Sequence, residues 1–255
     1  MSYFFIEGVP LAAGRIVELC PGDVKHAYRV LRRRKGDWLD IGDGEGTVYS
    51  GVVIAAGPGL IQVRLEQPVV LDDPPLFITL LQSLAKNEKM DLVVRQAVEL
   101  GVSRIIPVIT ERSVPRWDGD KGRRRVIRWR TIARAASAQC RRSRIPEVKP
   151  PVDFLQALAT LPAPRAGLTL VPWEGEKKLG LGELLRQPFP FPGGFLSLFI
   201  GPEGGFDESE INALSVTGAR SVHLGPRILR TETASAVTLA LVQAAWGDLG
   251  GGDRP

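Results

Sequence analysis

Between residues 77 and 246, short apolar segments alternate with segments whose apolar residues recur at helical spacing, and this alternation most constrains the fold. We predict strands at residues 77–81, 105–109, 167–171, 196–200 and 222–224, and helices at residues 86–100, 123–139, 207–218 and 231–246. Such alternation forms a mostly parallel sheet covered by helices. The 44% hydrophobic content is ample for the core of such a domain.

The first 70 or so residues have a different pattern, with short strands and turns around one short helix. Strands are predicted at residues 3–6, 15–19, 38–41, 47–54 and 60–65, with a helix that Asp23 would cap. This pattern indicates a small β-barrel. Because Asp72-Asp73-Pro74-Pro75 separates the two patterns, we predict a barrel domain over 1–72, an α/β domain over 73–249 and a disordered tail over 250–255.

Two glycine-bearing turns follow predicted strands near the C-terminus, at Gly201-Pro202-Glu203-Gly204-Gly205 and at Gly225-Pro226. Each lies where a strand meets a helix, and ligands of open α/β sheets bind at such carboxyl ends of strands. Neither turn matches G-x-G-x-x-G or a phosphate-binding P-loop, which disfavours nicotinamide and nucleoside triphosphate ligands. Adjacent glycines also suit tight structural turns, so spacing alone leaves a purely structural role open.

Positive charge is concentrated in one part of the chain. The formal net charge is +5, and residues 111–150 carry 13 Lys and Arg against 4 Asp and Glu. A second cationic group contains Arg29, Arg32 and Arg33 in the barrel region. Both patterns are consistent with contact to a nucleic-acid backbone and also with ordinary solvated surface.

Cysteine and histidine are sparse and isolated. Cys20 and Cys140 form no C-x-x-C pair, and His26 and His223 lie far apart, so we expect neither a metal site nor a disulfide framework. The first residues lack the basic start of a signal peptide, and no apolar run approaches the roughly 20 residues of a membrane span. These features predict a cytoplasmic protein that does not enter membranes.

Several longer motifs identify a family. They occupy residues 30–32, 43–46, 99–102, 110–114, 199–206 and 224–234. Residues 199–206 read Phe-Ile-Gly-Pro-Glu-Gly-Gly-Phe, and residues 227–234 read Arg-Ile-Leu-Arg-Thr-Glu-Thr-Ala. With these motifs in order along nearly its whole length, the chain resembles the RsmE-type 16S rRNA uridine methyltransferases of the SPOUT class.

The resemblance implies an N-terminal PUA-like β-barrel for RNA and a C-terminal SPOUT α/β domain with a trefoil knot that holds S-adenosylmethionine. It also implies a homodimer and methylation of N3 of a uridine in the decoding region of 16S rRNA in the small ribosomal subunit. Two alternatives stay open: methylation of another RNA site, and a non-catalytic RNA-binding or ribosome assembly factor.

The resemblance also implies roles for individual residues, with 171–174 as a third wall of the donor pocket. The implied cofactor-binding residues are Val171, Pro172, Phe199, Ile200, Gly201, Glu203, Gly204, Gly205, Leu224, Gly225, Ile228, Leu229, Thr233 and Ala234. The implied RNA-binding residues are Arg29, Arg32, Arg33, Lys86, Arg112, Arg134 and Arg142.

For catalysis, we expect Arg230 or Arg142 to stabilise the uridine anion and Glu203 to orient its loop or accept the N3 proton. Two positions depart from the family pattern: Gln96 replaces a usual basic residue, and Arg141 a usual glycine.

Overall fold

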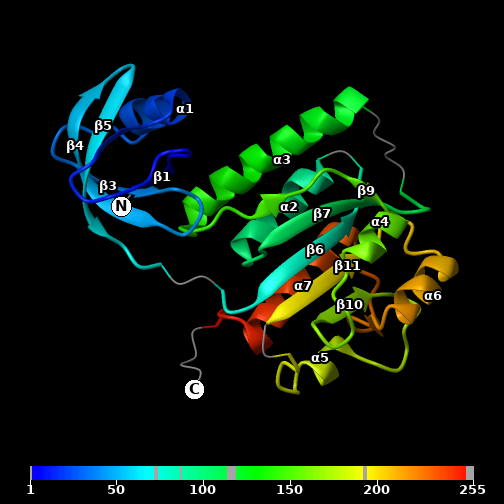
Figure 1. The fold of residues 1–255 in the computed structure, drawn as a ribbon. Coiled ribbons are helices and arrows are strands. Elements are labelled where there is room, and N and C mark those ends of the chain that lie inside the picture. The colour runs from blue at the N-terminus through cyan, green and yellow to red at the C-terminus, as the bar shows by residue number, and fades with distance from the viewer. Residues whose placement is uncertain (1, 72–73, 87, 114–118, 192–193, 251–255) are drawn as a thin grey trace. The chain divides into compact units, whose positions relative to one another are not determined.

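The computed structural model describes residues 2–71, 74–86, 88–113, 119–191 and 194–250 (Figure 1). Contacts group the chain into two compact units, Met1–Asp73 with Arg134–Ile145, and Pro74–Ala133 with Pro146–Pro255. Residues 134–145, which the sequence-based division assigns to the C-terminal domain, thus belong by their contacts to the first unit. Except for Gly250, the predicted tail lies outside the described residues.

The first unit is built on a five-stranded sheet in the order β1-β3-β4-β5-β2. The strands are β1 (Ser2–Phe5), β2 (Ile16–Glu18), β3 (Trp38–Gly42), β4 (Val48–Gly57) and β5 (Leu60–Pro68). β1 runs parallel to β3, and the other pairs are antiparallel. Alternate residues such as Leu39, Val53 and Val63 point into one apolar core and are fully buried. All five predicted strands are confirmed.

The predicted short helix of this unit is present, but its start differs from the prediction. α1 (Pro21–Lys25) begins after Cys20, with Asp23 inside the first turn, and a π-helical turn η1 (His26–Val30) follows it. Pro21 suits the first helical position because a backbone N–H there has no intrahelical partner to lose. The expectation that Asp23 caps the helix is therefore wrong.

The contacts of Arg141 account for an arginine at a position where the family usually has glycine. It follows helix α3 (Gly119–Cys140) with φ +60°, in the left-handed region where glycine is favoured. Its guanidinium Nη2 donates to Oδ2 of Asp40 at 2.7 Å, and the Asp40 side chain is only 3% exposed. This ion pair offsets the backbone strain that a glycine would avoid.

The second unit contains a parallel sheet in the order β12-β10-β11-β6-β7-β8, with β9 also paired to β7. The strands are β6 (Phe77–Ser83), β7 (Arg104–Ile109), β8 (Glu147–Val148), β9 (Val152–Asp153), β10 (Leu168–Pro172), β11 (Phe195–Ile200) and β12 (Arg220–Val222). Four of the five predicted strands are confirmed, and the fifth, predicted at 222–224, is present as β12 but overlaps the prediction only at Val222. β8 and β9 were not predicted because two residues show no periodicity.

Helices cover this sheet. They are α2 (Lys89–Glu99), α4 (Phe154–Ala159), α5 (Leu181–Leu184), α6 (Glu208–Val216), α7 (Thr231–Trp246) and the N-terminal part of α3. α4 and α6 pack on a cluster around the fully buried Phe199, whereas α7 packs against α2 and contacts β11. The predicted capping box of α6 is confirmed, since Asp207 accepts from the Ser209 backbone N–H and Glu210 Oε2 accepts from the Asp207 N–H.

Among the described residues, no helix has the length and apolarity of a membrane span. Within the same ranges, no three His, Cys, Asp or Glu side chains gather closely enough to hold a metal ion.

Candidate functional site

A pocket of about 880 Å³ lies in the second unit, at the carboxyl ends of three neighbouring parallel strands. The loops after β10, β11 and β12 form its walls, and Lys89 of α2 and the start of α7 complete them. This is the edge at which open parallel sheets bind ligands, because each strand there gives way to an irregular loop. Its volume lies in the range of small-molecule sites.

The first glycine turn brings bare backbone to the pocket. Gly205 has φ +70°, and its N–H donates to the carbonyl oxygen of Pro202 at 3.1 Å. A Cβ at Gly205 would lie 2.2 Å from Oε1 of Glu174, a residue of the loop after β10. An alanine here would be strained by the backbone conformation, and its Cβ would displace the tip of Glu174, so glycine is favoured where the two walls meet.

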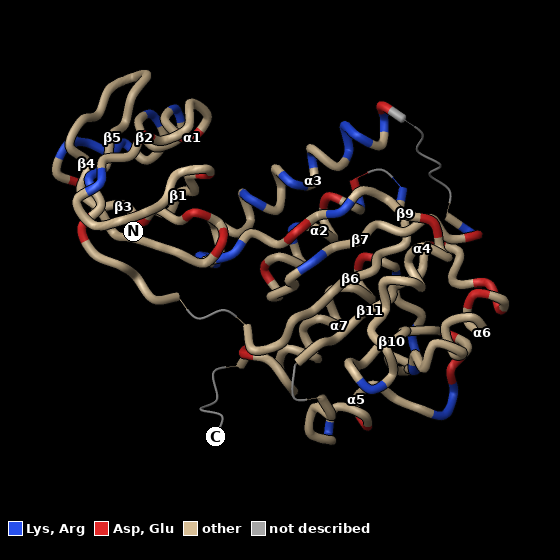
Figure 2. The backbone as a smooth tube through the Cα atoms, in the orientation of Figure 1, with Lys and Arg blue, Asp and Glu red and all other residues tan. Residues whose placement is uncertain are grey.

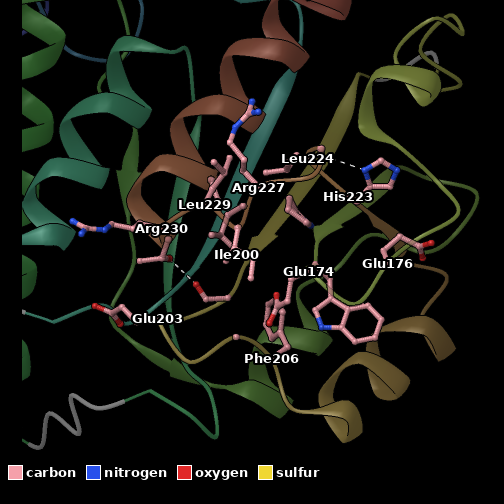
Figure 3. Close-up of a pocket in the computed structure, with 18 of the residues that line it drawn as sticks. Glu174, Glu176, Ile200, Glu203, Phe206, His223, Leu224, Arg227, Leu229 and Arg230 are labelled. Carbon is pink, nitrogen blue, oxygen red and sulfur yellow. Dashed lines mark hydrogen bonds between the residues drawn. The ribbon is translucent and has the colours of Figure 1, made fainter.

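The second turn runs from His223 to Arg230 and also contains a left-handed glycine. Gly225 has φ +110°, and its N–H donates to Nδ1 of His223 at 3.2 Å, an interaction drawn in Figure 3. Nδ1 must be unprotonated to accept this bond. Ile228 of the same turn is 86% exposed, although it lines the pocket.

An ion-pair group lies on one side of the pocket. Lys89 Nζ is 3.1 Å from Glu203 Oε1 and 3.6 Å from Glu232 Oε2, and Glu203 Oε1 also accepts from the Lys86 backbone N–H at 3.1 Å. Partial burial raises the pKa of Glu203, but the Lys86 N–H and the Lys89 ammonium outweigh it and hold that pKa below its usual value. Glu203 is therefore ionised at neutral pH.

Polar groups occupy two sides of the pocket, with apolar residues between them. In Figure 3, Glu203 and Arg230 lie on one side, and Glu176 and His223 lie on the other. Ile200, Leu224, Leu229 and the cationic Arg227 lie between them, and Glu174 lies beside Phe206. Arg230 is exposed and extends away from Leu224. The pocket therefore presents apolar and polar surface together, as small-molecule sites do.

The loop after β10 is held by its own hydrogen bonds. Glu176 Oε1 accepts from the backbone N–H groups of Lys178 at 2.6 Å and Leu179 at 3.2 Å, and these bonds lower the Glu176 pKa. Lys177 Nζ donates to the carbonyl oxygen of Glu174 at 2.7 Å. These local bonds order the third wall together with non-local ones, since the Trp173 N–H donates to the Val222 carbonyl oxygen at 3.0 Å and the His223 N–H donates to that of Leu179 at 2.9 Å.

The structure brings most of the predicted cofactor residues together. Those that line the pocket are Pro172, Ile200, Gly201, Glu203, Gly205, Leu224, Gly225, Ile228, Leu229 and Ala234. Val171 and Phe199 are buried in the core beside it, and neither they nor Gly204 and Thr233 line it. Of the three predicted catalytic residues, Arg230 and Glu203 line the pocket, whereas Arg142 belongs to the first unit.

The predicted RNA-binding residues are divided between the units. Arg29, Arg32, Arg33, Arg134 and Arg142 belong to the first, and Lys86 and Arg112 to the second. Arg29 and Arg32 are exposed, and Figure 2 shows further Lys and Arg along α3.

Three of these residues have acidic partners within their own unit. Arg33 pairs with Asp37, Arg134 with Glu7 and Asp23, and Arg112 with Asp207. An RNA phosphate would compete with these carboxylates for the arginines.

Among the pocket-lining residues that sequence reasoning missed are Lys89, Glu176, Lys177 and His223. No motif marks them, since their roles arise from loops and a helix that meet only in the folded chain. Clustering of charge in residues 174–178, just after a predicted strand, was the available signal.

Comparisons with known proteins match both units. An RNA methyltransferase domain model matches residues 72–243, and an RNA methyltransferase PUA domain model matches residues 19–66. The chain is 33% identical over 243 residues to a ribosomal RNA small subunit methyltransferase E from Mycobacterium bovis, which covers 94% of this chain and 90% of that protein. The same enzyme from Bacillus subtilis is 31% identical and covers 86% of each.

A solved structure agrees with these matches. The ribosomal RNA small subunit methyltransferase E from Neisseria gonorrhoeae, bound to S-adenosylmethionine, superposes with a TM-score of 0.86 at 31% identity. The match covers 98% of this chain and 99% of that one, so the similarity includes both units.

Proposed function

This chain belongs to the ribosomal RNA small subunit methyltransferase E family, with a PUA-like N-terminal fold and a SPOUT-class α/β fold, and we propose that it methylates N3 of a uridine in the decoding region of 16S rRNA. S-adenosylmethionine is the methyl donor, and the substrate is the small ribosomal subunit. We further propose a trefoil knot in the α/β domain, a homodimeric assembly and a cytoplasmic location, as the family resemblance implies.

The pocket formed by the two glycine turns is the observation that carries this proposal. The residues present fit the donor, because Gly201, Gly205 and Gly225 expose backbone to the cavity and apolar side chains lie between its polar sides. A nucleoside joined to an amino acid needs such close backbone approach along its length and polar groups near its ends. When bound, S-adenosylmethionine supplies an electrophilic methyl group on a sulfonium.

The chain must remove a proton and align the nucleophile. Uracil N3 is protonated at neutral pH and attacks only after this proton leaves. We assign Arg230, or Arg142, to stabilise the uridine anion, since a guanidinium stays charged at any working pH. Glu203 orients the first turn or accepts the proton, and its bonds to Lys86 and Lys89 favour the orienting role.

Binding of the RNA falls to the cationic residues of both units. Arg29, Arg32 and Arg33 of the first unit and Lys86 and Arg112 of the second would contact phosphates, together with Arg134 and Arg142. Such contacts are dominated by counterion release, so affinity for the ribosomal subunit falls steeply with added salt.

Calorimetric titration of S-adenosylmethionine into the purified protein tests the cofactor assignment, and absence of binding excludes it. Mass spectrometry of 16S rRNA from a deletion strain tests the base, and N3-methyluridine at the wild-type level there rejects the substrate. If the deletion strain lacks a different methylated base in any RNA, the enzyme methylates that site instead. If the protein binds RNA but does not bind S-adenosylmethionine, it is a non-catalytic assembly factor.

Single-turnover assays with small subunits from that strain test the residues. With donor and subunits saturating, we expect Arg230→Ala and Glu203→Ala each to slow methyl transfer by 10-fold or more, on the order of the 10² to 10⁴ typical of acid–base and anion-stabilising groups. Arg186→Ala removes an exposed arginine outside the pocket and serves as the control. Wild-type rates in both pocket variants contradict the assignment.

A further inference from the structure

A buried hydroxyl at the wall of the pocket joins the two glycine turns. Thr231 is the first residue of α7, directly after the second turn, and is 4% exposed. Its Oγ1 donates to the carbonyl oxygen of Gly201 at 2.6 Å, and Gly201 opens the first turn. The bond therefore spans 30 positions of sequence and connects two walls of one cavity.

A second buried side chain fixes the direction of this bond. Gln82, fully buried near the end of β6, donates from Nε2 to Thr231 Oγ1 at 2.9 Å and to the carbonyl oxygen of Ser83 at 3.1 Å. Carbonyl oxygens can only accept, so the threonine proton goes to Gly201 and its lone pair accepts from Gln82. Both amide protons of Gln82 and the hydroxyl of Thr231 are thereby used.

We infer that Thr231 is a positioning residue for the methyl-donor pocket, whose hydroxyl holds the first turn and the end of the second at the separation that the cofactor requires. The identity of that cofactor rests on the proposed function. Gln82 supports the threonine from β6, the strand beside β11. Loss of the hydroxyl leaves one N–H of the fully buried Gln82 without a partner, and it removes the bond that ties the half-buried Gly201 carbonyl to α7.

Loss of this hydroxyl should affect the pocket more than the fold. The rest of α7 is anchored independently, with Leu239 and Val242 fully buried and Trp246 Nε1 donating to the carbonyl oxygen of Gln187 at 2.7 Å. The perturbation is thus limited to the first turn of α7, to the turn that begins at Gly201 and to the Gln82 side chain on β6. We expect cofactor affinity to fall because the walls no longer hold one separation.

The test compares three variants of the full-length protein. Thr231→Val removes the hydroxyl at nearly constant shape, and Thr231→Ser retains it. Thr238→Val makes the same change on the same helix, where the fully buried Thr238 donates to the carbonyl oxygen of Ala234, four residues earlier, at 2.7 Å. The dissociation constant for S-adenosylmethionine is measured by calorimetry well below each melting temperature.

We expect roughly tenfold weaker cofactor binding in Thr231→Val, which corresponds to about 1.4 kcal/mol. Binding in Thr231→Ser stays within about twofold of wild type, and Thr238→Val binds as wild type whatever its melting temperature. Equal affinities in Thr231→Val and Thr238→Val overturn the inference. If Thr231→Val does not fold, the same measurement is made on Gln82→Met, which removes the N–H that donates to Thr231 and should also weaken cofactor binding. Unchanged cofactor affinity in Gln82→Met overturns the inference as well.

The two proposals fail in different ways. Absence of S-adenosylmethionine binding to the wild-type protein rejects the cofactor and with it the proposed function. Binding by wild type that is insensitive to both Thr231→Val and Gln82→Met leaves the proposed function intact and rejects only the positioning role.

Discussion

Gly205→Ala should damage both the stability of the protein and its pocket. The residue has φ +70°, and left-handed backbone costs a residue with a Cβ about 1–2 kcal/mol. The added Cβ would lie 2.2 Å from Oε1 of Glu174, so this carboxylate must move as well. Glu174 is exposed and its tip can swing into solvent, so the clash adds little to the free energy of unfolding but reshapes the wall between two loops.

This strain predicts a measurable change in melting temperature. For a domain of 150 to 250 residues, 1 kcal/mol shifts the melting temperature by roughly 2–4 °C, so Gly205→Ala should lower it by about 2–8 °C. We expect the same variant to bind S-adenosylmethionine about tenfold more weakly, a loss of about 1.4 kcal/mol. Differential scanning calorimetry and isothermal titration calorimetry measure the two effects.

Gly182→Ala is the matched control. Gly182 lies in α5 without a left-handed φ, and a Cβ there meets no atom within 4 Å. Alanine is the better helix former, so the control should be neutral or slightly stabilising and should bind the cofactor normally. If Gly205→Ala matched Gly182→Ala in both measurements, neither the strain nor the Glu174 contact would matter as argued.

Three further predictions concern charged groups. Lys89→Met should lower stability by less than about 1 kcal/mol, because the Lys89 and Glu203 side chains are about a quarter to a third exposed; a larger loss on urea unfolding contradicts this. The Lys86 N–H and Lys89 outweigh burial and hold the folded-state pKa of Glu203 below its usual 4.5. The ionised carboxylate therefore contributes to the free energy of unfolding above about pH 4.5, and this contribution disappears as the pH falls through the folded-state pKa. Wild type should then lose stability between pH 5 and 3 more steeply than Glu203→Gln, and parallel profiles would count against the bonded carboxylate. Arg141→Gly should relieve about 1 kcal/mol of backbone strain but leave the buried Asp40 carboxylate without this partner. We expect the free energy of unfolding to fall by about 1–3 kcal/mol, and a second change, Asp40→Asn, to restore part of that loss. An Arg141→Gly variant more stable than wild type would refute this balance.

Local chemistry alone determined much of this protein. The strand and helix periods, the Asp207 capping box and the left-handed glycine that closes α6, Gly218, each depend on residues within a few positions of one another. The same is true of the two glycine turns, whose placement after strands pointed to a ligand site but left a purely structural role open. The family motifs extended that prediction to a named cofactor.

Only the tertiary structure decided which segments meet. The strand order β12-β10-β11-β6-β7-β8, the inclusion of residues 134–145 in the first unit and the shared contact of Lys89 with Glu203 and Glu232 join residues far apart in sequence. The bond from Thr231 to Gly201 is of the same kind. Periodicity and caps report the backbone within a few residues, whereas such contacts depend on how the elements pack, and no local pattern encodes that.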